Sequence, residues 1–488
     1  MIGYVTPSFF AKRQVYRLPQ QIHAEKVMDI YKGAIESLNK LQSNVQYIQN
    51  AKIKNNQENN MSEMSKFLER SGVTLEVLDT LPIIHVAGTN GKGTTCSYCE
   101  SILKIHGFKT GFYSSPHLLE VRERIRINGR PISQEKFARH FWRIYNTLES
   151  QKSTPHDMPL YFRFLTIMAF HVFLSEKVDV AIVEVGIGGE FDCTNVIRKT
   201  VVGGITPLDV DHTTLLGNSI ESIAWNKAGI MKPGGYVFTA PQPESVMKVL
   251  EQRSIERQCT LNVVRDLYPN SEDGRIPQHI KRVNASLALA LSRNFMNIVS
   301  RNNNNNNVED VFNIEKARKA IESTRWPGRY EVIKKGKIRY YLDGAHTTQS
   351  VEVCAQWFVS NVSKSNSNNR VLVFNVTGER KPDDLMKLLL KCGFATALFI
   401  PNVGDDNDND DNKDEILTVK RQLEKSEINR SIWLGLDGSA DARAFPSFAK
   451  AIAHLNSQNK EFDVLVTGSI HLIGAAMSLL DPTLGGLL

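Results

Sequence analysis

The sequence contains no long apolar run. Its longest one, Phe164–Leu174, is interrupted by Thr166 and His171. A helix that crosses a bilayer needs about 20 mostly apolar residues. The run therefore predicts a buried helix rather than a membrane span. A hydrophobic share of 41% and a charged share of 23% are typical of a globular chain with a full core.

Cysteine is also scarce, and its spacing excludes a zinc site built from cysteine pairs. The six cysteines are Cys96, Cys99, Cys193, Cys259, Cys354 and Cys392. Cys96 and Cys99 form a C-x-x-C pair, but no second cysteine pair or histidine pair completes a ligand set. We predict that both are small buried residues of one helix. The scattered pattern favours a reducing compartment.

Blocks of basic residues are missing as well, although the formal net charge is +7. Acidic residues are interspersed almost throughout, which makes nucleic-acid binding the weaker interpretation of this charge. Small anionic substrates are the stronger one. We therefore expect small-molecule partners, with no nucleic acid and no membrane span.

Acidic residues are absent before Glu25, where Lys12, Arg13 and Arg17 are basic. This segment resembles a weak mitochondrial transit peptide, but it is short of serine. An ordinary cytosolic start fits equally well, and no secretory signal is present. The expected location is the cytoplasm, with a mitochondrial form as the alternative.

Three polar insertions interrupt the chain, and none of them can bury apolar surface. We expect all three to be loops: Asn302–Asn307, Ser363–Asn369 and Asp405–Glu415. The third consists almost entirely of Asp and Asn, yet it lacks the glycine and the spaced ligands of a calcium-binding EF-hand.

Short apolar strands alternate with helical patterns between these insertions. The first set is Pro82–Ala87, Val178–Val185 and Val201–Thr206, and the second is Lys337–Leu342, Arg370–Val376, Ala397–Ile400 and Phe462–Thr467. Apolar strands joined by helices predict an α/β fold in which each parallel sheet is covered on both faces. The length allows two or three domains. We predict two, residues 1–325 and 326–488, with Trp326–Arg329 as the hinge.

The segment Gly88–Thr94 is predicted to bind nucleotide phosphates because it follows a strand and precedes a helix. Its glycines allow backbone N–H groups to surround a phosphate at the positive end of the helix. Lys92 is placed to reach the β- and γ-phosphates, and Thr94 to bind Mg²⁺. The segment departs from the usual P-loop, since Val86 replaces the first glycine and Gly93 follows the lysine.

Polar residues also follow the next two predicted strands. Glu184 ends one of them, and Asp209 to His212 follow the other. The carboxyl ends of parallel strands meet at one edge of a sheet, where such folds bind ligands. Glu184 is therefore a candidate Mg²⁺ ligand, and His212 a candidate ligand or orienting group.

Several motifs along the chain, taken together, resemble one family. They are His85–Thr94, Ser114–His117, Arg122–Gly129, Val183–Gly189, Asp192–Asn195, Asp211–Gly217, Lys227–Ile230, Trp326–Arg329, Asp343–His346 and Thr467–Ser469. In this order they resemble the folate branch of the Mur ligase superfamily, the folylpolyglutamate synthases of eukaryotic type. The resemblance implies a P-loop-type parallel sheet domain followed by a smaller Rossmann-like α/β domain.

The resemblance also implies a reaction. ATP would phosphorylate the terminal carboxylate of a reduced folate's glutamate tail, and the amine of L-glutamate would attack the acyl phosphate. The implied cofactors are ATP and Mg²⁺, with K⁺ as a further expectation, and the implied oligomeric state is a monomer.

Residue roles follow from the same resemblance. The catalytic residues would be Lys92, His212, Lys227 and His346, with Lys227 carbamylated. Thr94, Glu184 and His212 would bind metal, and Ser115, Pro116, His117 and Ser469 would contact the substrates. The nucleotide would bind to Gly88, Thr89, Asn90, Gly91, Lys92, Gly93, Thr94, Asn284, Arg329 and Asp343.

The chain departs from the family's pattern in two respects, and two alternative functions stay open. Thr347 stands where the family often has asparagine, and the polar insertions have no counterpart in the family. A dihydrofolate synthase, or a bifunctional enzyme, would use the same chemistry, although Phe191–Asn195 differs from the Leu-Asp-Ala-Thr-Asn typical of that type. A non-catalytic protein that binds ATP or nucleic acid is the more remote alternative.

Overall fold

The computed structural model describes residues 24–41, 59–269, 276–302, 312–362, 369–376, 380–402, 413–436 and 441–488. The N-terminal segment that resembles a transit peptide and most of the three predicted loops lie outside these residues. Two loop boundaries can be checked. Asn302 is the last residue of a helix, and a helix begins at Lys413, so the third predicted loop ends earlier than expected.

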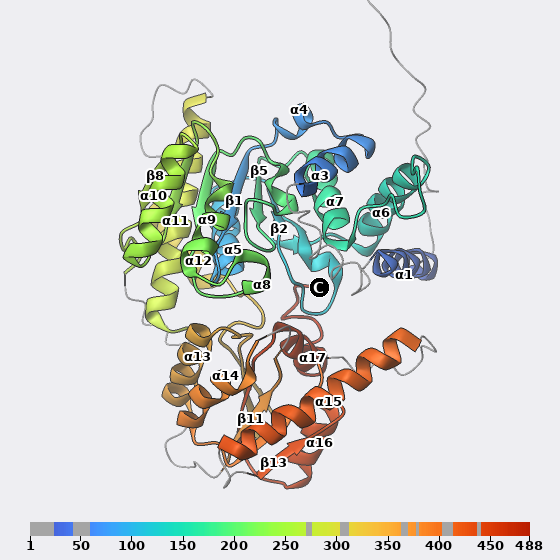
Figure 1. Ribbon diagram of the computed structural model, residues 1–488, viewed down its shortest axis with the longest axis vertical. Helices are drawn as coiled ribbons and strands as arrows, with labels where there is room; N and C mark the ends of the chain where they lie inside the picture. The colour runs from blue at the N-terminus through green and yellow to red at the C-terminus, as the bar shows by residue number, and fades with distance from the viewer. Residues whose placement is uncertain are drawn as a thin grey trace, which may run out of the picture.

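The described residues form two sheets, and the α/β class is confirmed (Figure 1). The first sheet has eight strands in the order β4-β3-β2-β5-β1-β6-β7-β8. Their bounds are β1 Ile83–Ala87, β2 Thr110–Tyr113, β3 Ile125–Ile127, β4 Arg130–Pro131, β5 Val180–Glu184, β6 Val202–Ile205, β7 Tyr236–Thr239 and β8 Thr260–Val263.

The second sheet has six strands in the order β13-β12-β11-β14-β10-β9. Their bounds are β9 Glu331–Lys335, β10 Ile338–Leu342, β11 Arg370–Phe374, β12 Thr396–Phe399, β13 Asp441–Ala444 and β14 Phe462–Thr467. All seven predicted strands are present. The strands that were not predicted are the short or half-exposed ones, and three of them, β3, β4 and β9, pair antiparallel at a sheet edge.

Helices cover both faces of the first sheet, as predicted. Odd and even positions of β1 point to opposite faces, so that Ile83 joins one core while Ile84 and Val86 join the other. The first core is closed by α1 Ala24–Lys40, α3 Asn59–Arg70, α4 Leu75–Leu78, α6 Gln134–Glu149 and α7 Tyr161–Glu176. The second is closed by α5 Lys92–Ile105, α11 Gln278–Asn302 and α12 Ile314–Ser323.

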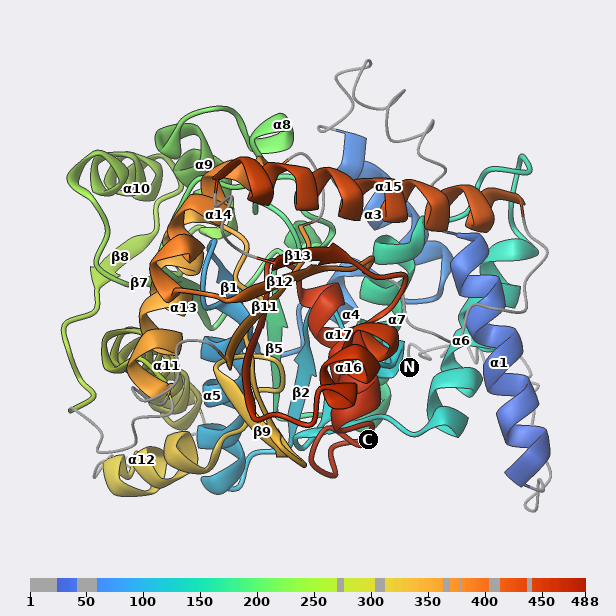
Figure 2. The ribbon, with the colours of Figure 1, turned by 90° about the horizontal axis from the view of Figure 1, so that it is seen from below.

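The remaining helices cover the far end of the first sheet and the whole second sheet. At that end of the first sheet lie α8 Thr213–Leu216, α9 Ile220–Lys227 and α10 Glu244–Glu256. The second sheet is covered by α13 Thr348–Asn361, α14 Pro382–Leu389, α15 Lys413–Leu436, α16 Phe448–Ser457 and α17 Ile470–Leu480. Figure 2 shows α15 running across the molecule, on the opposite side of the second sheet from α16 and α17.

The apolar run Phe164–Leu174 lies inside α7, where every residue from Arg163 to Phe173 is buried. The prediction of a buried helix is confirmed. Among the described residues, no helix is both long enough and apolar enough to span a membrane.

The segment between the two sheets is short. It runs from the end of α12 at Ser323 to the start of β9 at Glu331 and contains Trp326–Arg329. We propose to divide the chain into residues 1–325 and 326–488 at this point. A cavity lies where the two parts meet, and the linker residues Trp326, Pro327 and Arg329 line it.

Candidate functional site

The loop Gly88–Thr94 leaves β1 and enters α5, as predicted. Gly91 is the N-cap of α5 in a left-handed conformation, with φ of 86°. A Cβ atom at Gly91 would lie 2.2 Å from Oδ1 of Asn284, so the loop and α11 approach more closely than a side chain permits. The backbone N–H groups of Thr89 and Asn90 both donate to the carbonyl of Pro207, which ties the loop to the end of β6.

Two lysines converge on the first residue of this loop. Nζ of Lys92 donates to the carbonyl oxygen of Gly88 at 3.1 Å, and Nζ of Lys227 donates to the same oxygen at 2.7 Å. Lys227 is 3% exposed. Burial, and then the charge of Lys92, lower the pKa of Lys227 well below its ordinary value. The amine of Lys227 is therefore buried against the first residue of the loop, and its charged form is disfavoured there.

Glu184 ends β5 beside the loop, and its carboxylate is buried. One of its oxygens accepts a hydrogen bond from the backbone N–H of Ser115 at 3.1 Å. Burial raises the pKa of Glu184, although the Lys92 ammonium opposes that rise. A buried carboxylate of this kind is stabilised by a nearby cation.

Asp211 joins the two parts of the chain. Its Oδ1 accepts a hydrogen bond from Arg380 at 3.0 Å, and its Oδ2 lies 3.5 Å from Nε2 of His346 and 3.5 Å from Nε2 of His212. Burial opposes the ionisation of Asp211, but His346, His212 and Arg380 outweigh it and hold the pKa of the carboxyl below its usual range. Burial lowers the pKa of His212 to about 4.

The second sheet supplies the opposite wall. Asp343 follows β10, and its carboxylate accepts from the N–H of Tyr330 at 3.0 Å. Nδ1 of His346 bonds to the carbonyl of Gly344 at 2.7 Å, so this nitrogen carries the proton and Nε2 faces Asp211. Ser469 is the N-cap of α17 and accepts from the N–H of His471 at 3.2 Å.

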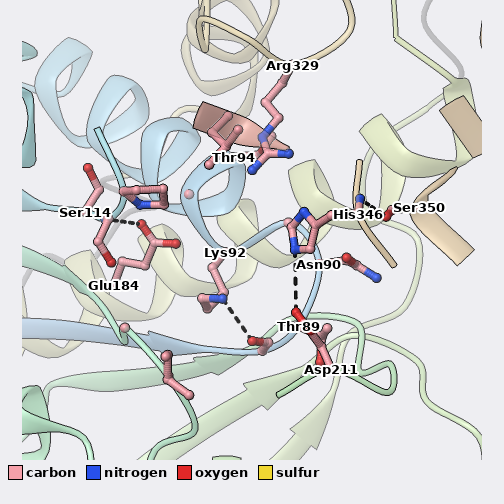
Figure 3. A pocket seen from close by; sticks show the side chains of 18 of the residues that line it. Thr89, Asn90, Lys92, Thr94, Ser114, Glu184, Asp211, Arg329, His346 and Ser350 are labelled. Atoms are coloured by element: carbon pink, nitrogen blue, oxygen red, sulfur yellow. Dashed lines mark hydrogen bonds and ion pairs between the residues drawn. The ribbon is translucent and has the colours of Figure 1, made fainter. Parts of the chain in front are cut away.

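These residues border one cavity of about 990 Å³ between the two sheets. In Figure 3, Lys92, Thr94 and Glu184 lie around the same space as Arg329, with Asp211 and His346 to one side. The cavity lining contains every nucleotide, metal and catalytic residue predicted from the sequence, together with Ser115, Pro116 and Ser469. His117 does not line the cavity. Its Nδ1 accepts a hydrogen bond from Arg124, and burial lowers its pKa to about 3.

Sequence reasoning missed Arg380, which lines the cavity and pairs with Asp211. A lone arginine six residues beyond β11 has no distinctive local signal. No role for Thr347 followed from the sequence either. In the structure Thr347 caps α13, since its hydroxyl accepts from the N–H of Ser350.

No family model matches the chain. Several curated proteins do. The chain is 38% identical to the mitochondrial folylpolyglutamate synthase of Bos taurus, and the match covers 93% of each. It is 37% identical to the corresponding protein of Homo sapiens, over 98% of this chain and 96% of that protein. The chain belongs to the folylpolyglutamate synthase family.

Solved structures of this family share the fold. A Mycobacterium tuberculosis folylpolyglutamate synthase, solved with ADP and AMPPCP, superposes with a TM-score of 0.69 at 25% identity, covering 86% of this chain and 95% of that one. The Escherichia coli protein FolC, solved with DHPP and ADP, gives 0.67 at 26% identity, covering 86% and 92%. The predicted Mur ligase-like architecture is confirmed.

Membership in the folylpolyglutamate synthase family settles the reaction class. The chain is an ATP-using ligase that forms carbon–nitrogen bonds, and its reaction is the polyglutamylation of folate. The cavity at the phosphate loop has the volume of a ligand site, which typically measures about 300 to 1,000 Å³.

Proposed function

We propose that the chain adds L-glutamate to the γ-carboxylate of the glutamate tail of a reduced folate, inside the cavity between the two sheets. The γ-phosphoryl group of ATP moves to that carboxylate, and the amine of L-glutamate then attacks the acyl phosphate. The tetrahedral intermediate collapses to the amide, and ADP and phosphate leave. The convergence of Lys92, Glu184, Arg329 and His346 on one cavity carries this proposal.

In the part of the cavity next to the loop Gly88–Thr94, the main role of the side chains is to neutralise charge on the phosphates. Lys92 and Arg329 supply positive charge near the position of the transferred phosphoryl group. Asn284, beside Gly91, and Asp343 would hold the rest of the nucleotide. Because the walls come from both sheets, only a closed arrangement of the two parts assembles the full site.

Magnesium fits the residues present. Among the described residues, no cluster of three His, Cys, Asp or Glu side chains could hold a metal ion. Mg²⁺ does not need one, because it usually keeps waters and phosphate oxygens and takes only one or two protein carboxylates. The buried carboxylate of Glu184 and the hydroxyl of Thr94 are suitable ligands, and His212 is a third candidate. When bound, Mg²⁺ would neutralise charge on the phosphates.

Lys227 is a candidate for carbamylation, which requires a neutral amine. Its lowered pKa favours that form. A carbamate would convert a buried cation into an anion beside the phosphate loop and would support a second Mg²⁺. A K⁺ ion remains a further expectation from the family.

Incoming L-glutamate is expected at the second sheet. Ser469 begins α17, and backbone N–H groups at a helix N-terminus attract a carboxylate. Nε2 of His346 faces the cavity beside Asp211 and is placed to interact with the attacking amine. Ser115 and Pro116, on the opposite wall, would contact the folate. We further propose a monomer with only small-molecule partners, located in the cytoplasm and also in the mitochondrion, the compartment named for the bovine and human relatives.

Dihydropteroate is the alternative acceptor. Phe191 and Cys193 line the cavity where dihydrofolate synthases tend to carry leucine and alanine, which favours the polyglutamylating activity.

Mass spectrometry of products formed from tetrahydrofolate, L-glutamate, ATP and Mg²⁺ tests the proposal, with dihydropteroate in a parallel reaction. We expect glutamylated tetrahydrofolate. We also expect that Lys92→Ala abolishes the product while the circular-dichroism spectrum stays unchanged, because Lys92 is a half-buried residue at the start of α5 and not part of the core. Product from dihydropteroate alone would contradict the proposed acceptor, and wild-type activity of Lys92→Ala would contradict the phosphate role.

A further inference from the structure

Gly93 is a glycine for a reason other than its backbone conformation. It lies in the first turn of α5 and has no positive φ. However, a Cβ atom at Gly93 would lie 2.9 Å from Cζ2 of Trp326 and 3.2 Å from its Cε2 and Nε1. The edge of the indole therefore packs directly against the phosphate loop. A side chain at position 93 would have to displace it.

Trp326 is held on its other side by aromatic and charged groups. The ring of Phe112 lies 5.6 Å away, centroid to centroid, and the guanidinium of Arg126 lies 4.9 Å from the indole centroid. Arg126 is buried and pairs with the buried carboxylate of Glu100 at 3.6 Å. Removing one partner of such a buried pair is costly, so Arg126 stays paired with Glu100 beside the indole. The indole is thus held between the first sheet and the phosphate loop.

The linker is fixed to the second sheet within four residues of Trp326. The N–H of Gly344 donates to the carbonyl of Gly328 at 3.3 Å, and the N–H of Tyr330 donates to Asp343 at 3.0 Å. Arg329 lies between these two anchors and also lines the cavity. One short segment therefore connects the phosphate loop, Arg329 and the second sheet.

We propose that Trp326 is a positioning residue for the ligation. Its contact with Gly93 sets the place of the linker, and thereby the place of Arg329 and of the second sheet relative to the bound phosphates. The departure of this loop from the usual P-loop, glycine after lysine, provides the space that the indole fills. This inference rests on the proposed function, because its consequence is measured on the ligation reaction.

The contact predicts a specific pattern of rates. We expect Trp326→Ala to lower kcat by about 10- to 100-fold, since a misplacement of about 1 Å in a catalytic group has effects of that size. The KM for folate should change much less, because the apolar wall of the cavity near Phe191 is not altered. Trp326→Phe should retain most of the rate, because a smaller ring still covers Gly93.

A double-mutant cycle separates positioning from general damage. Gly93→Ala alone should lower kcat, because its methyl group displaces the indole. In the Trp326→Ala background the same change should cost several-fold less than it does in the wild-type chain, because there is no longer an indole to displace. Losses that multiply would overturn the proposal, and so would a wild-type rate for Trp326→Ala.

Trp142→Ala is the matched control. Trp142 is a partly buried tryptophan on α6, far from the phosphate loop in sequence, and its indole N–H donates to the carbonyl of Ile30. Its removal should lower the melting temperature with little change in kcat. Equal losses of kcat in both alanine variants would reduce Trp326 to a structural role. If the wild-type chain forms no product at all, the proposed function fails instead.

Discussion

At the scale of single residues, Lys227 is the most unusual group in the site. It is buried beside a second lysine, and both amines donate to one carbonyl. Two charged amines in that place would repel each other in a poorly solvated environment. Lys232, five residues further along the chain, is partly buried, and burial lowers its pKa to about 8, but it bonds to Asn195 and does not line the cavity.

Lys227 and Lys232 provide a matched test. We expect Lys227→Ala to lower kcat at least 100-fold, because the group that would support the phosphates is lost, and we expect acetate or formate to restore part of the rate. Steady-state kinetics with and without added carboxylate measures both effects. Lys232→Ala should reduce the melting temperature and retain most of the activity. If Lys227→Ala is as active as the wild type, Lys227 is only structural.

At the scale of elements, the junction between β1 and α5 depends on close contacts of backbone with side chains. Gly88 has φ of 148°, and a Cβ atom there would lie 1.8 Å from Oγ1 of Thr206. The end of β6 therefore occupies the space that a side chain at position 88 would need. Gly107, just beyond α5, also has a positive φ of 91°, but no atom lies within 4 Å of its Cβ position.

The two glycines should therefore respond differently to alanine. Gly107→Ala should cost only backbone strain, about 1 to 2 kcal/mol of unfolding free energy. Gly88→Ala should in addition displace the phosphate loop, and we expect at least tenfold weaker binding of ATP. Isothermal titration calorimetry of ATP and chemical denaturation measure the two effects. Equal ATP affinity in the two variants would contradict the tight junction at Gly88.

Elements with a strong local pattern were predicted well. The seven predicted strands are mostly apolar, and α7 is buried from Arg163 to Phe173. Of the missed strands, β2 is fully buried but spans only four residues. Those at the sheet edges have weaker patterns, because β3 and β4 are short and alternate residues of β9 and β13 are exposed. Such edge strands are specified by their neighbours more than by their own residues.

At the scale of the whole molecule, buried histidines make stability depend on pH. Burial lowers the pKa of His85, His117 and His171 to about 3 in each case. In the unfolded chain a histidine titrates near 6.5. Between these values the unfolded chain binds more protons than the folded one. The stability from these groups is therefore complete above about pH 6.5 and is lost as the pH falls toward 3.

His171 provides the test, because it lies away from the cavity and bonds to Ser71 and Arg143. Between about pH 7.5 and pH 5.5 a histidine of this kind should contribute a loss of about 1.4 kcal/mol in unfolding free energy. His171→Gln should remove that part of the pH dependence, as measured by urea denaturation at both values. An unaltered slope in His171→Gln would contradict the prediction.

The sequence by itself determined the elements with strong local patterns and the chemical groups at their ends. The loop Gly88–Thr94 and the carboxylate of Glu184 follow from local patterns, because a strand, a glycine-rich turn and a helix start are each specified by neighbouring residues. Only the tertiary structure decided which groups meet. Lys227 reaches Gly88, Arg380 reaches Asp211, and Trp326 covers Gly93 across large separations in the chain. These contacts depend on how sheets and helices pack, and packing is a property of the assembled core that no short stretch of sequence contains.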